Sequence, residues 1–245
     1  MNFKIESDNT ILLLMPTYNR VEGLTRALKS VKDQDYKNWK IALIDDGCIV
    51  PAKEIAEDIF DEEEIKKVIF YHTGEDAESK LNRKKQNAES YDSWDQHAGV
   101  YFYPYANLAM DEINFDIATF LCDDDLLIDG DLRELNRFYK HHPELMYSYS
   151  NCVLFDERHE NWWDARTFIH RFFRIGKVNP FHNLDTTQVS WRSHVFKVDG
   201  CKILETPHSN FDAYFFQSIA NKYGACHPNF LLSQFKNYHR EIFNL

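Results

Sequence analysis

Apolar residues in the first two thirds of the chain form short continuous runs separated by more polar segments. Runs of this kind are typical of strands that are buried on both faces of a parallel sheet. We therefore predict strands, in chain order, at residues 11–16, within 38–47, and at 66–72, 115–122 and 145–155.

Segments of helical periodicity lie between these runs. Apolar residues recur every three or four positions between residues 21 and 31, and we predict further helices at 105–113 and 131–142. Asn19 is a suitable N-cap for the first helix, and Glu22, three residues later, would complete a capping box.

Alternation of strands with helices predicts a doubly wound α/β fold with one mostly parallel sheet flanked by helices. Ligands of such sheets bind outside the carboxyl ends of the strands. Here those ends carry "PTYNR", "DDG" and "CDDD". We therefore expect these three polar clusters to converge on one edge of the sheet.

Two regions depart from the alternation. Residues 74–99 are polar and charged, with basic residues between 80 and 85, and predict either a solvated linker or a phosphate-contacting loop. After residue 156 the pattern becomes irregular and rich in aromatic residues. Because we find no internal repeat and no linker of low complexity, we predict one domain over residues 1–245.

Composition limits the partners. The 28 Lys and Arg against 39 Asp and Glu give a net charge of −11, which repels nucleic-acid backbones and anionic membranes on average. We find neither a signal segment nor an apolar run that approaches the roughly 18 residues of a membrane span. Five scattered cysteines without a Cys-x-x-Cys pair favour a reduced compartment, so we predict a cytoplasmic protein.

Three consecutive carboxylates, Asp123 to Asp125, follow the fourth predicted strand. Adjacent carboxylates raise one another's pKa unless a cation neutralises them. A site with a few carboxylate ligands suits Mg²⁺ or Mn²⁺, which complete their coordination with substrate phosphates. Helix capping explains Asp129 and Asp131, but it cannot use three consecutive acids.

The segment "ILLLMPTYNRVEGLTRALKSVKDQDYKNWKIALIDDG" and the later "TFLCDDDLL" resemble the inverting family 2 glycosyltransferases of GT-A fold. "TTQVSWRSHVFKVDG" and "NFDAYFFQSIANKYG" are similar to the acceptor half of that family. The resemblance implies a Rossmann-like nucleotide-binding half, about residues 1–125, and a less regular acceptor-binding half, about residues 126–245.

Carried over by position, the resemblance implies contacts with the nucleotide and with a metal ion. The nucleotide-binding residues would be Pro16, Thr17, Tyr18, Arg20, Asp46 and Asp123, with Tyr18 near the base and Asp46 accepting a hydrogen bond from a base N–H. The metal ligand would be Asp124, flanked by Asp125, and His239 would be a distal ligand of the metal or diphosphate unless it is an ordinary surface histidine.

This chain departs from the family pattern at three positions. Cys122 stands where the family has the first acid of its Asp-x-Asp segment, so Asp123 would have to supply the ribose contact. Ala106 replaces the arginine of an Arg-Asn pair, and Phe211 replaces the acid before Asp212.

The resemblance implies an aspartate as the catalytic base, which takes the proton of the acceptor hydroxyl as that oxygen attacks the anomeric carbon. Asp212, at the start of a helix, matches the position of this base, and Asp185 is the alternative. Trp162, Trp163 and Trp191 are expected either to stack on a sugar or base or to pack in the core. Arg192 would meet a phosphate or pair with an acid.

The residues and the resemblance together predict a metal-dependent, inverting glycosyltransferase that uses a nucleotide-diphosphate sugar, with a UDP-sugar as the expected donor and Mn²⁺ or Mg²⁺ as the ion. The expected acceptor is a saccharide, and a lipid-linked glycan is an alternative. A hydroxymethylated DNA base is the alternative, because residues 165–177 interleave aromatic and basic side chains. A nucleotide-sugar-binding protein without catalysis is a further alternative. A nucleotidyltransferase is disfavoured, because "MPTYNRVEG" lacks a Gly-rich basic loop.

Overall fold

The computed structural model describes residues 8–74, 102–155, 176–181, 184–203 and 211–237. The strands are β1 (Ile11–Thr17), β2 (Trp39–Asp45), β3 (Val68–His72), β4 (Ile117–Phe120), β5 (Asp125–Leu127), β6 (Tyr147–Phe155), β7 (Val189–Arg192) and β8 (His227–Asn237). The α-helices are α1 (Val21–Lys32), α2 (Ala52–Ile59), α4 (Tyr103–Glu112), α5 (Asp131–His141), α7 (Ser193–Lys197) and α8 (Phe211–Tyr223), and two short 3₁₀ helices are η1 (Ile65–Lys67) and η4 (Thr186–Gln188).

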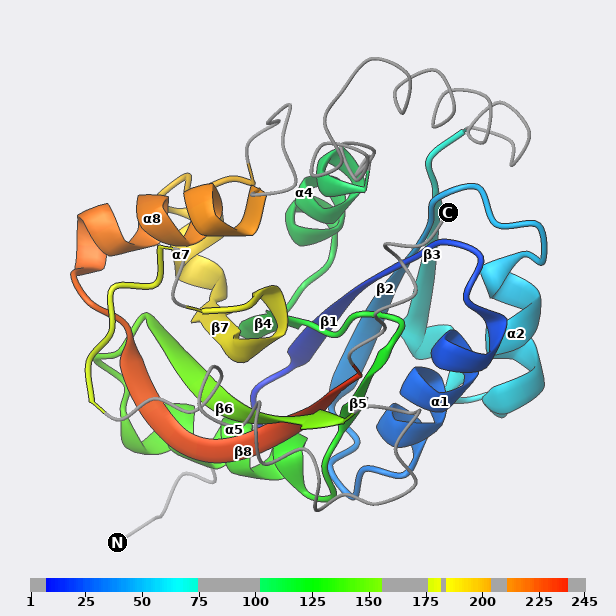
Figure 1. Cartoon of the computed structure of the whole chain (residues 1–245), viewed down its shortest axis with the longest axis horizontal. Helices are drawn as coiled ribbons and strands as arrows, with labels where there is room; N and C mark the ends of the chain where they lie inside the picture. The colour runs from blue at the N-terminus through cyan, green and yellow to red at the C-terminus, as the bar shows by residue number, and fades with distance from the viewer. Residues whose placement is uncertain (1–7, 75–101, 156–175, 182–183, 204–210, 238–245) are drawn as a thin grey trace, which may run out of the picture.

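One sheet runs through the described part of the chain, in the order β3-β2-β1-β4-β7-β6-β8-β5 (Figure 1). Strands β3, β2, β1 and β4 pair in parallel. Strand β7 then pairs antiparallel with both β4 and β6, β8 runs parallel to β6, and β5 closes the edge antiparallel to β8. The predicted α/β fold with a mostly parallel sheet flanked by helices is confirmed.

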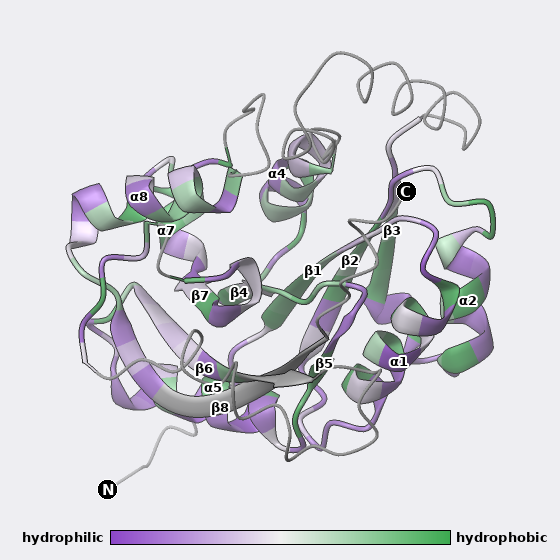
Figure 2. Cartoon of the chain, viewed as in Figure 1, coloured by the Kyte–Doolittle hydropathy of each residue, from purple (hydrophilic) through white to green (hydrophobic). Residues whose placement is uncertain are grey.

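Helices cover both faces of the sheet, because alternate residues of each strand point to opposite sides. In β1, Leu12 and Leu14 belong to a core shared with α4, α7 and α8. Ile11, Leu13 and Met15 belong to a second core, shared with α1, α2 and α5. Figure 2 shows the hydrophobic strands in the centre and the hydrophilic residues on the outer sides of the helices.

Several details differ from the predictions. Helix α2 and strand β5 were not predicted: the helix has only a narrow apolar stripe, and the strand has three residues. The capping box at α1 was wrong. The residue at the N-cap position is Arg20, which makes no side-chain capping bond, and Asn19 takes the left-handed conformation with a φ of 53°.

Aromatic residues of the second half pack in the interior. Trp191 is fully buried, and its ring lies 5.0 Å from that of Phe215 and 5.6 Å from that of Phe120. The packing role considered for Trp191 is therefore correct and the stacking role is wrong, whereas Trp162 and Trp163 lie outside the described residues.

Arg192 holds the end of helix α5. Its guanidinium donates to the carbonyl oxygens of Tyr139 (2.6 Å) and His142 (3.2 Å), and its Nε donates to that of Leu145 (2.8 Å). It also lies over the ring of Tyr139, 4.9 Å from the centroid. Carbonyls at the end of a helix have no partner inside the helix, so a cation is a favourable donor there. Neither a phosphate nor an acid is needed to explain this arginine.

Among the described residues, none of the helices combines the length and the apolar character that crossing a bilayer requires.

Replacing Arg192 by methionine should lower the free energy of unfolding by about 2 kcal/mol, because three carbonyls lose a charged donor. Urea denaturation followed by circular dichroism measures this change. Arg137→Met is the matched control, since Arg137 is 68% exposed and pairs only at 3.5 Å with Glu134. That exposed pair is expected to contribute less than about 1 kcal/mol. Equal losses in the two variants would contradict the bracing role of Arg192.

Candidate functional site

Three strand ends meet at one edge of the sheet. Thr17 ends β1, Asp46 follows β2 and Asp123 follows β4. The backbone N–H of Asp46 donates to the carbonyl of Thr17 (3.0 Å), and the hydroxyl of Thr17 donates to Oδ2 of Asp123 (2.9 Å). The expected convergence of the polar clusters is confirmed, and it follows from the parallel pairing of β2, β1 and β4.

Asp123 accepts hydrogen bonds from three residues at and after the end of β1. Its side chain is 7% exposed and accepts from the Thr17 hydroxyl, from the backbone N–H of Tyr18 (3.2 Å) and from Nη1 of Arg20 (3.1 Å). Burial raises its pKa to about 6, against the opposing effect of the Arg20 charge. Asp123 thus joins the loop after β4 to the turn between β1 and α1.

Arg20 connects two of the three consecutive acids. Its Nη1 lies 3.1 Å from Oδ1 of Asp123 and 2.5 Å from Oδ2 of Asp124. Burial lowers the pKa of this guanidinium, but the charges of Asp124 and Asp123 outweigh that effect and raise its pKa. Arg20 is therefore a cation within the protein itself that offsets the repulsion between these two acids.

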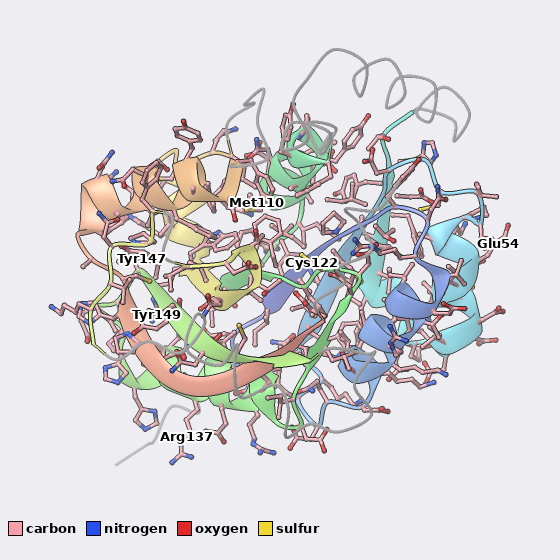
Figure 3. All side chains as sticks on the ribbon, viewed as in Figure 1. Glu54, Met110, Cys122, Arg137, Tyr147 and Tyr149 are labelled. Carbon is pink, nitrogen blue, oxygen red and sulfur yellow. The ribbon has the colours of Figure 1, made fainter. Side chains whose placement is uncertain are left out.

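Asp124 also belongs to a group of side chains that could hold a metal ion. Cys122, Asp124 and Asp125 each offer a ligand atom, and these atoms lie within 4.8 Å of one another. Figure 3 labels Cys122, where the chain leaves β4 and turns toward β5. Two carboxylates suit Mg²⁺ or Mn²⁺, and a thiolate is tolerated better by Mn²⁺, the softer ion. The residues present therefore fit a divalent cation, with Cys122 as a donor that sequence reasoning did not assign.

The two adjacent acids after β2 have different surroundings. Oδ1 of Asp45 accepts from the backbone N–H groups of Gly47 (3.0 Å) and Cys48 (2.8 Å), and Oδ2 accepts from that of Ala52 (2.9 Å). Asp45 therefore fixes the turn and the start of α2. Asp46 is buried at the same strand end, beside Thr17.

Asn19 holds the neighbouring loops together instead of capping α1. Its side-chain oxygen accepts from the backbone N–H of Ile49 (2.7 Å), and its own N–H lies 3.2 Å from the sulfur of Cys48. These bonds link the turn after β1 to the loop after β2. Of the nucleotide-contacting residues expected in "PTYNR", Pro16 and Thr17 lie at the end of β1, and Tyr18 and Arg20 lie in the turn that follows it.

The two candidate bases lie beside one another. The hydroxyl of Thr186 donates to Oδ2 of Asp212 (2.7 Å), at the start of α8, and Thr186 directly follows Asp185. The side chain of Asp185 caps η4, and the backbone N–H of Asp185 donates to Oε1 of Gln188 (3.0 Å). Asp185 thus has a structural task, and Thr186 is a site residue that sequence reasoning missed because a single threonine gives no pattern.

Other sequence expectations fall elsewhere. Asn107 exchanges two hydrogen bonds with the backbone of Ile203 (2.8 and 3.0 Å), which ties α4 to the segment after α7. Ala106 is fully buried, so its position on α4 faces the core. His239 and the basic residues between 80 and 85 lie outside the described residues.

Helix α1 lies close to the backbone of the acidic loop at Gly23. A Cβ added there would lie 2.6 Å from the carbonyl oxygen of Asp123, a distance that forces the backbone to shift. Alanine in place of glycine in a helix normally stabilises by about 0.5–1 kcal/mol. We expect Gly23→Ala to have the opposite sign, lowering stability by about 1–3 kcal/mol as overpacking does.

Thermal denaturation and Mn²⁺ titration of the Gly23→Ala variant test this expectation, since displacement of Asp123 should also weaken cation binding at Asp124. Val21→Ala, at an exposed position of the same helix, is the control and should change neither property. A stabilised Gly23→Ala protein with normal Mn²⁺ affinity would show that the contact is unimportant.

Comparisons with known proteins agree with this geometry. The sequence model of Glycosyl transferase family 2 matches residues 13–85. The chain is 25% identical over 143 residues to the GalNAc(5)-diNAcBac-PP-undecaprenol beta-1,3-glucosyltransferase of Campylobacter jejuni subsp. jejuni. That match covers 58% of this chain and 38% of the relative, so the chain spans well under half of the relative's length.

Solved structures share the fold. Residues 1–349 of TarS of S. aureus in complex with UDP-GlcNAc superpose with a TM-score of 0.65 at 13% identity, covering 94% of this chain and 59% of that TarS chain. The mannosyltransferase PcManGT of Pyrobaculum calidifontis, in complex with GDP-Man and Mn²⁺, gives a TM-score of 0.57 at 13% identity, covering 93% of this chain and 57% of the other. Residues 13–85, which contain "PTYNR" and "DDG", are thus similar to family 2 of the glycosyltransferases, and most of the chain shares the fold of TarS and PcManGT.

Proposed function

We propose that this chain is a metal-dependent, inverting glycosyltransferase that moves a sugar from a nucleotide-diphosphate donor, a UDP-sugar, to a hydroxyl of a saccharide acceptor. The observation that carries the proposal is the meeting of Thr17, Asp46 and Asp123 at one sheet edge beside the Cys122, Asp124 and Asp125 group. This edge offers acceptors for a base, donors for phosphates and ligands for a cation within one set of braced loops.

The proposed binding of the nucleotide-sugar donor is based on residues at the ends of β1 and β2. Asp46 accepts a hydrogen bond from a ring N–H of the base, a task for which a carboxylate suits because it only accepts. Pro16, Thr17 and Tyr18 line the nucleotide, and Arg20 supplies positive charge toward the diphosphate. A UDP donor is supported by the likeness to TarS in complex with UDP-GlcNAc.

Asp124, Asp125 and Cys122 would hold the cation, whose role when bound is to offset the charge that develops on the departing diphosphate. The ion is Mn²⁺ or Mg²⁺, and Mn²⁺ is favoured by the thiol. The likeness to PcManGT in complex with Mn²⁺ supports a divalent ion. His239 remains a proposed distal ligand.

Asp212 is the proposed catalytic base. It lies at the N-terminus of α8, and the hydroxyl of Thr186 fixes one of its oxygens. The carboxylate takes the proton from the acceptor hydroxyl while that oxygen attacks the anomeric carbon and the bond to the diphosphate breaks. A single displacement of this kind inverts the configuration at the anomeric carbon.

We further propose that residues 1–245 act as one GT-A domain, with the donor half up to about residue 125 and the acceptor half after it. One buried cluster supports this, because it contains residues from Leu12 of β1 through Ile219 of α8 and Cys226. We also propose a cytoplasmic location, which the five free cysteines favour.

Two alternatives to this proposal are a DNA base as the acceptor and a nucleotide-sugar-binding protein without catalysis. The DNA-base hypothesis was based on residues 165–177, of which 165–175 lie outside the described residues, and a saccharide remains the proposed acceptor. A binding protein without catalysis has one observation in its favour: Phe211, at the position of the family's paired acid, packs 5.0 Å from the ring of Phe102 in the core. Hydrolysis of the donor sugar with Mn²⁺ distinguishes an enzyme from such a protein.

Thermal stability with candidate donors tests the proposed donor site. UDP or a UDP-sugar with Mn²⁺ should raise the melting temperature by roughly 5 °C or more at about 100 times the dissociation constant, because ligand binding to the folded state stabilises by mass action. GDP, CMP and dTDP sugars should raise it less. If no nucleotide changes the midpoint, the donor proposal is wrong.

Asp124→Asn should weaken Mn²⁺ binding by at least about tenfold, because the cation group loses one of its two carboxylates. Mn²⁺ electron paramagnetic resonance measures the free ion directly. Asp58→Asn, an exposed charge-matched change on α2, should leave the affinity unaltered. Full Mn²⁺ affinity in Asp124→Asn would place the cation elsewhere.

Asp212→Asn should lower kcat by about 10²-fold or more, the usual contribution of a general base, while donor binding stays normal. Asp185→Ala should instead lower stability by about 1 kcal/mol through loss of the η4 cap and keep most of kcat. Steady-state transfer assays and thermal melts on both variants provide the comparison. The reverse pattern would make Asp185 the base.

A further inference from the structure

The guanidinium of Arg20 forms its closest contact with an oxygen of the proposed cation site. Nη1 is 2.5 Å from Oδ2 of Asp124 and 3.1 Å from Oδ1 of Asp123. Asp124 in turn lies in the group with Cys122 and Asp125. A divalent cation bound to the Asp124 carboxylate would lie close to this guanidinium, and the two positive charges repel one another at such a distance.

Asp123 and Asp124 differ in the hydrogen-bond donors that they retain when Arg20 moves away. Asp123 also accepts from the Thr17 hydroxyl (2.9 Å) and from the Tyr18 N–H (3.2 Å), so two donors still satisfy its buried carboxylate. Asp124 is more exposed, at 17% of its side chain against 7% for Asp123. Replacing the guanidinium by a divalent cation at Asp124 therefore costs little free energy, whereas Asp123 remains hydrogen-bonded to the end of β1.

Arg20 can leave Asp124 without leaving the site. Its side chain is 34% exposed, and its backbone carbonyl is fixed at the start of α1 by a hydrogen bond from the N–H of Leu24 (2.8 Å). A guanidinium on this anchor stays at the same edge of the sheet as Thr17 and Asp123. Diphosphate oxygens are its natural partner there, because Arg binds them with two parallel N–H donors.

We propose that Arg20 is an exchangeable counter-ion of Asp124: a divalent cation that binds Asp124 displaces the guanidinium, which then binds the diphosphate of the donor. This inference rests on the proposed function and deepens it. Cation and donor binding are then coupled through one side chain. Arg20 opposes the binding of the cation alone and favours the binding of the nucleotide once the cation is present.

Arg20→Gln tests the proposal, because glutamine keeps polar atoms and removes the charge. Mn²⁺ alone should bind the variant about tenfold more tightly than the natural protein, and UDP in saturating Mn²⁺ should bind it about tenfold more weakly. Electron paramagnetic resonance measures the first affinity and isothermal titration calorimetry the second. Neither readout depends on catalytic activity.

Lys29→Gln is the matched control. It removes one positive charge from the exposed last turn of the same helix, where the side chain forms no contact with the acids. It should change both affinities less than about twofold, since exposed charges beyond the first contact are screened by salt. Arg20→Lys is a second variant that keeps the charge and should keep Mn²⁺ affinity within about threefold of the natural protein, so it separates charge from folding.

The outcomes are distinct. Opposite changes in the two affinities, limited to Arg20→Gln, support the exchange. Weaker binding of both Mn²⁺ and UDP by Arg20→Gln would overturn it and make Arg20 a support of the site. Unchanged affinities would also overturn it, together with the contact of Arg20 with the diphosphate, while leaving the rest of the proposed function intact. If the natural protein binds neither Mn²⁺ nor UDP, the proposed function and this inference both fail.

Discussion

The buried carboxylate of Asp123 is the interaction on which the rest of the site depends. It joins the end of β1 to the loop after β4 through the Thr17 hydroxyl, the Tyr18 N–H and the Arg20 guanidinium. A buried charge without such partners would be costly. Because these contacts are specific, they also fix the turn into α1 and the direction of Asp124. The acidic cluster is therefore compatible with a stable fold even before any ligand is considered.

The fold was largely predictable because its strands are short apolar runs and its first helix has a clear stripe. Short elements were not: β5 has three residues, and its pairing with β8 depends on a segment more than a hundred residues away. The Asn19 prediction failed because a residue suited to capping is equally suited to the left-handed conformation. Local sequence could not decide between these two uses.

The location of the candidate site could be predicted from the sequence, but the contacts of its individual residues could not. Convergence of the strand ends follows from the topology, so "PTYNR", "DDG" and "CDDD" could be placed together from sequence alone. The partners could not: nothing local indicates that Arg20 contacts both Asp123 and Asp124, that Thr186 binds Asp212, or that Arg192 holds the end of α5. Such contacts join residues far apart in the chain, and they need three-dimensional coordinates.

Strand β1 contributes side chains to both hydrophobic cores. Leu12 and Leu14 pack in one core, and Ile11, Leu13 and Met15 pack in the other. The last residue of β1 carries the hydroxyl that binds Asp123. Repacking either side would therefore disturb the proposed donor site through this strand. Attempts to redirect the proposed transferase to a new acceptor should leave β1 and its neighbours unchanged and vary the outer surface of α8, where Tyr214 is already 44% exposed.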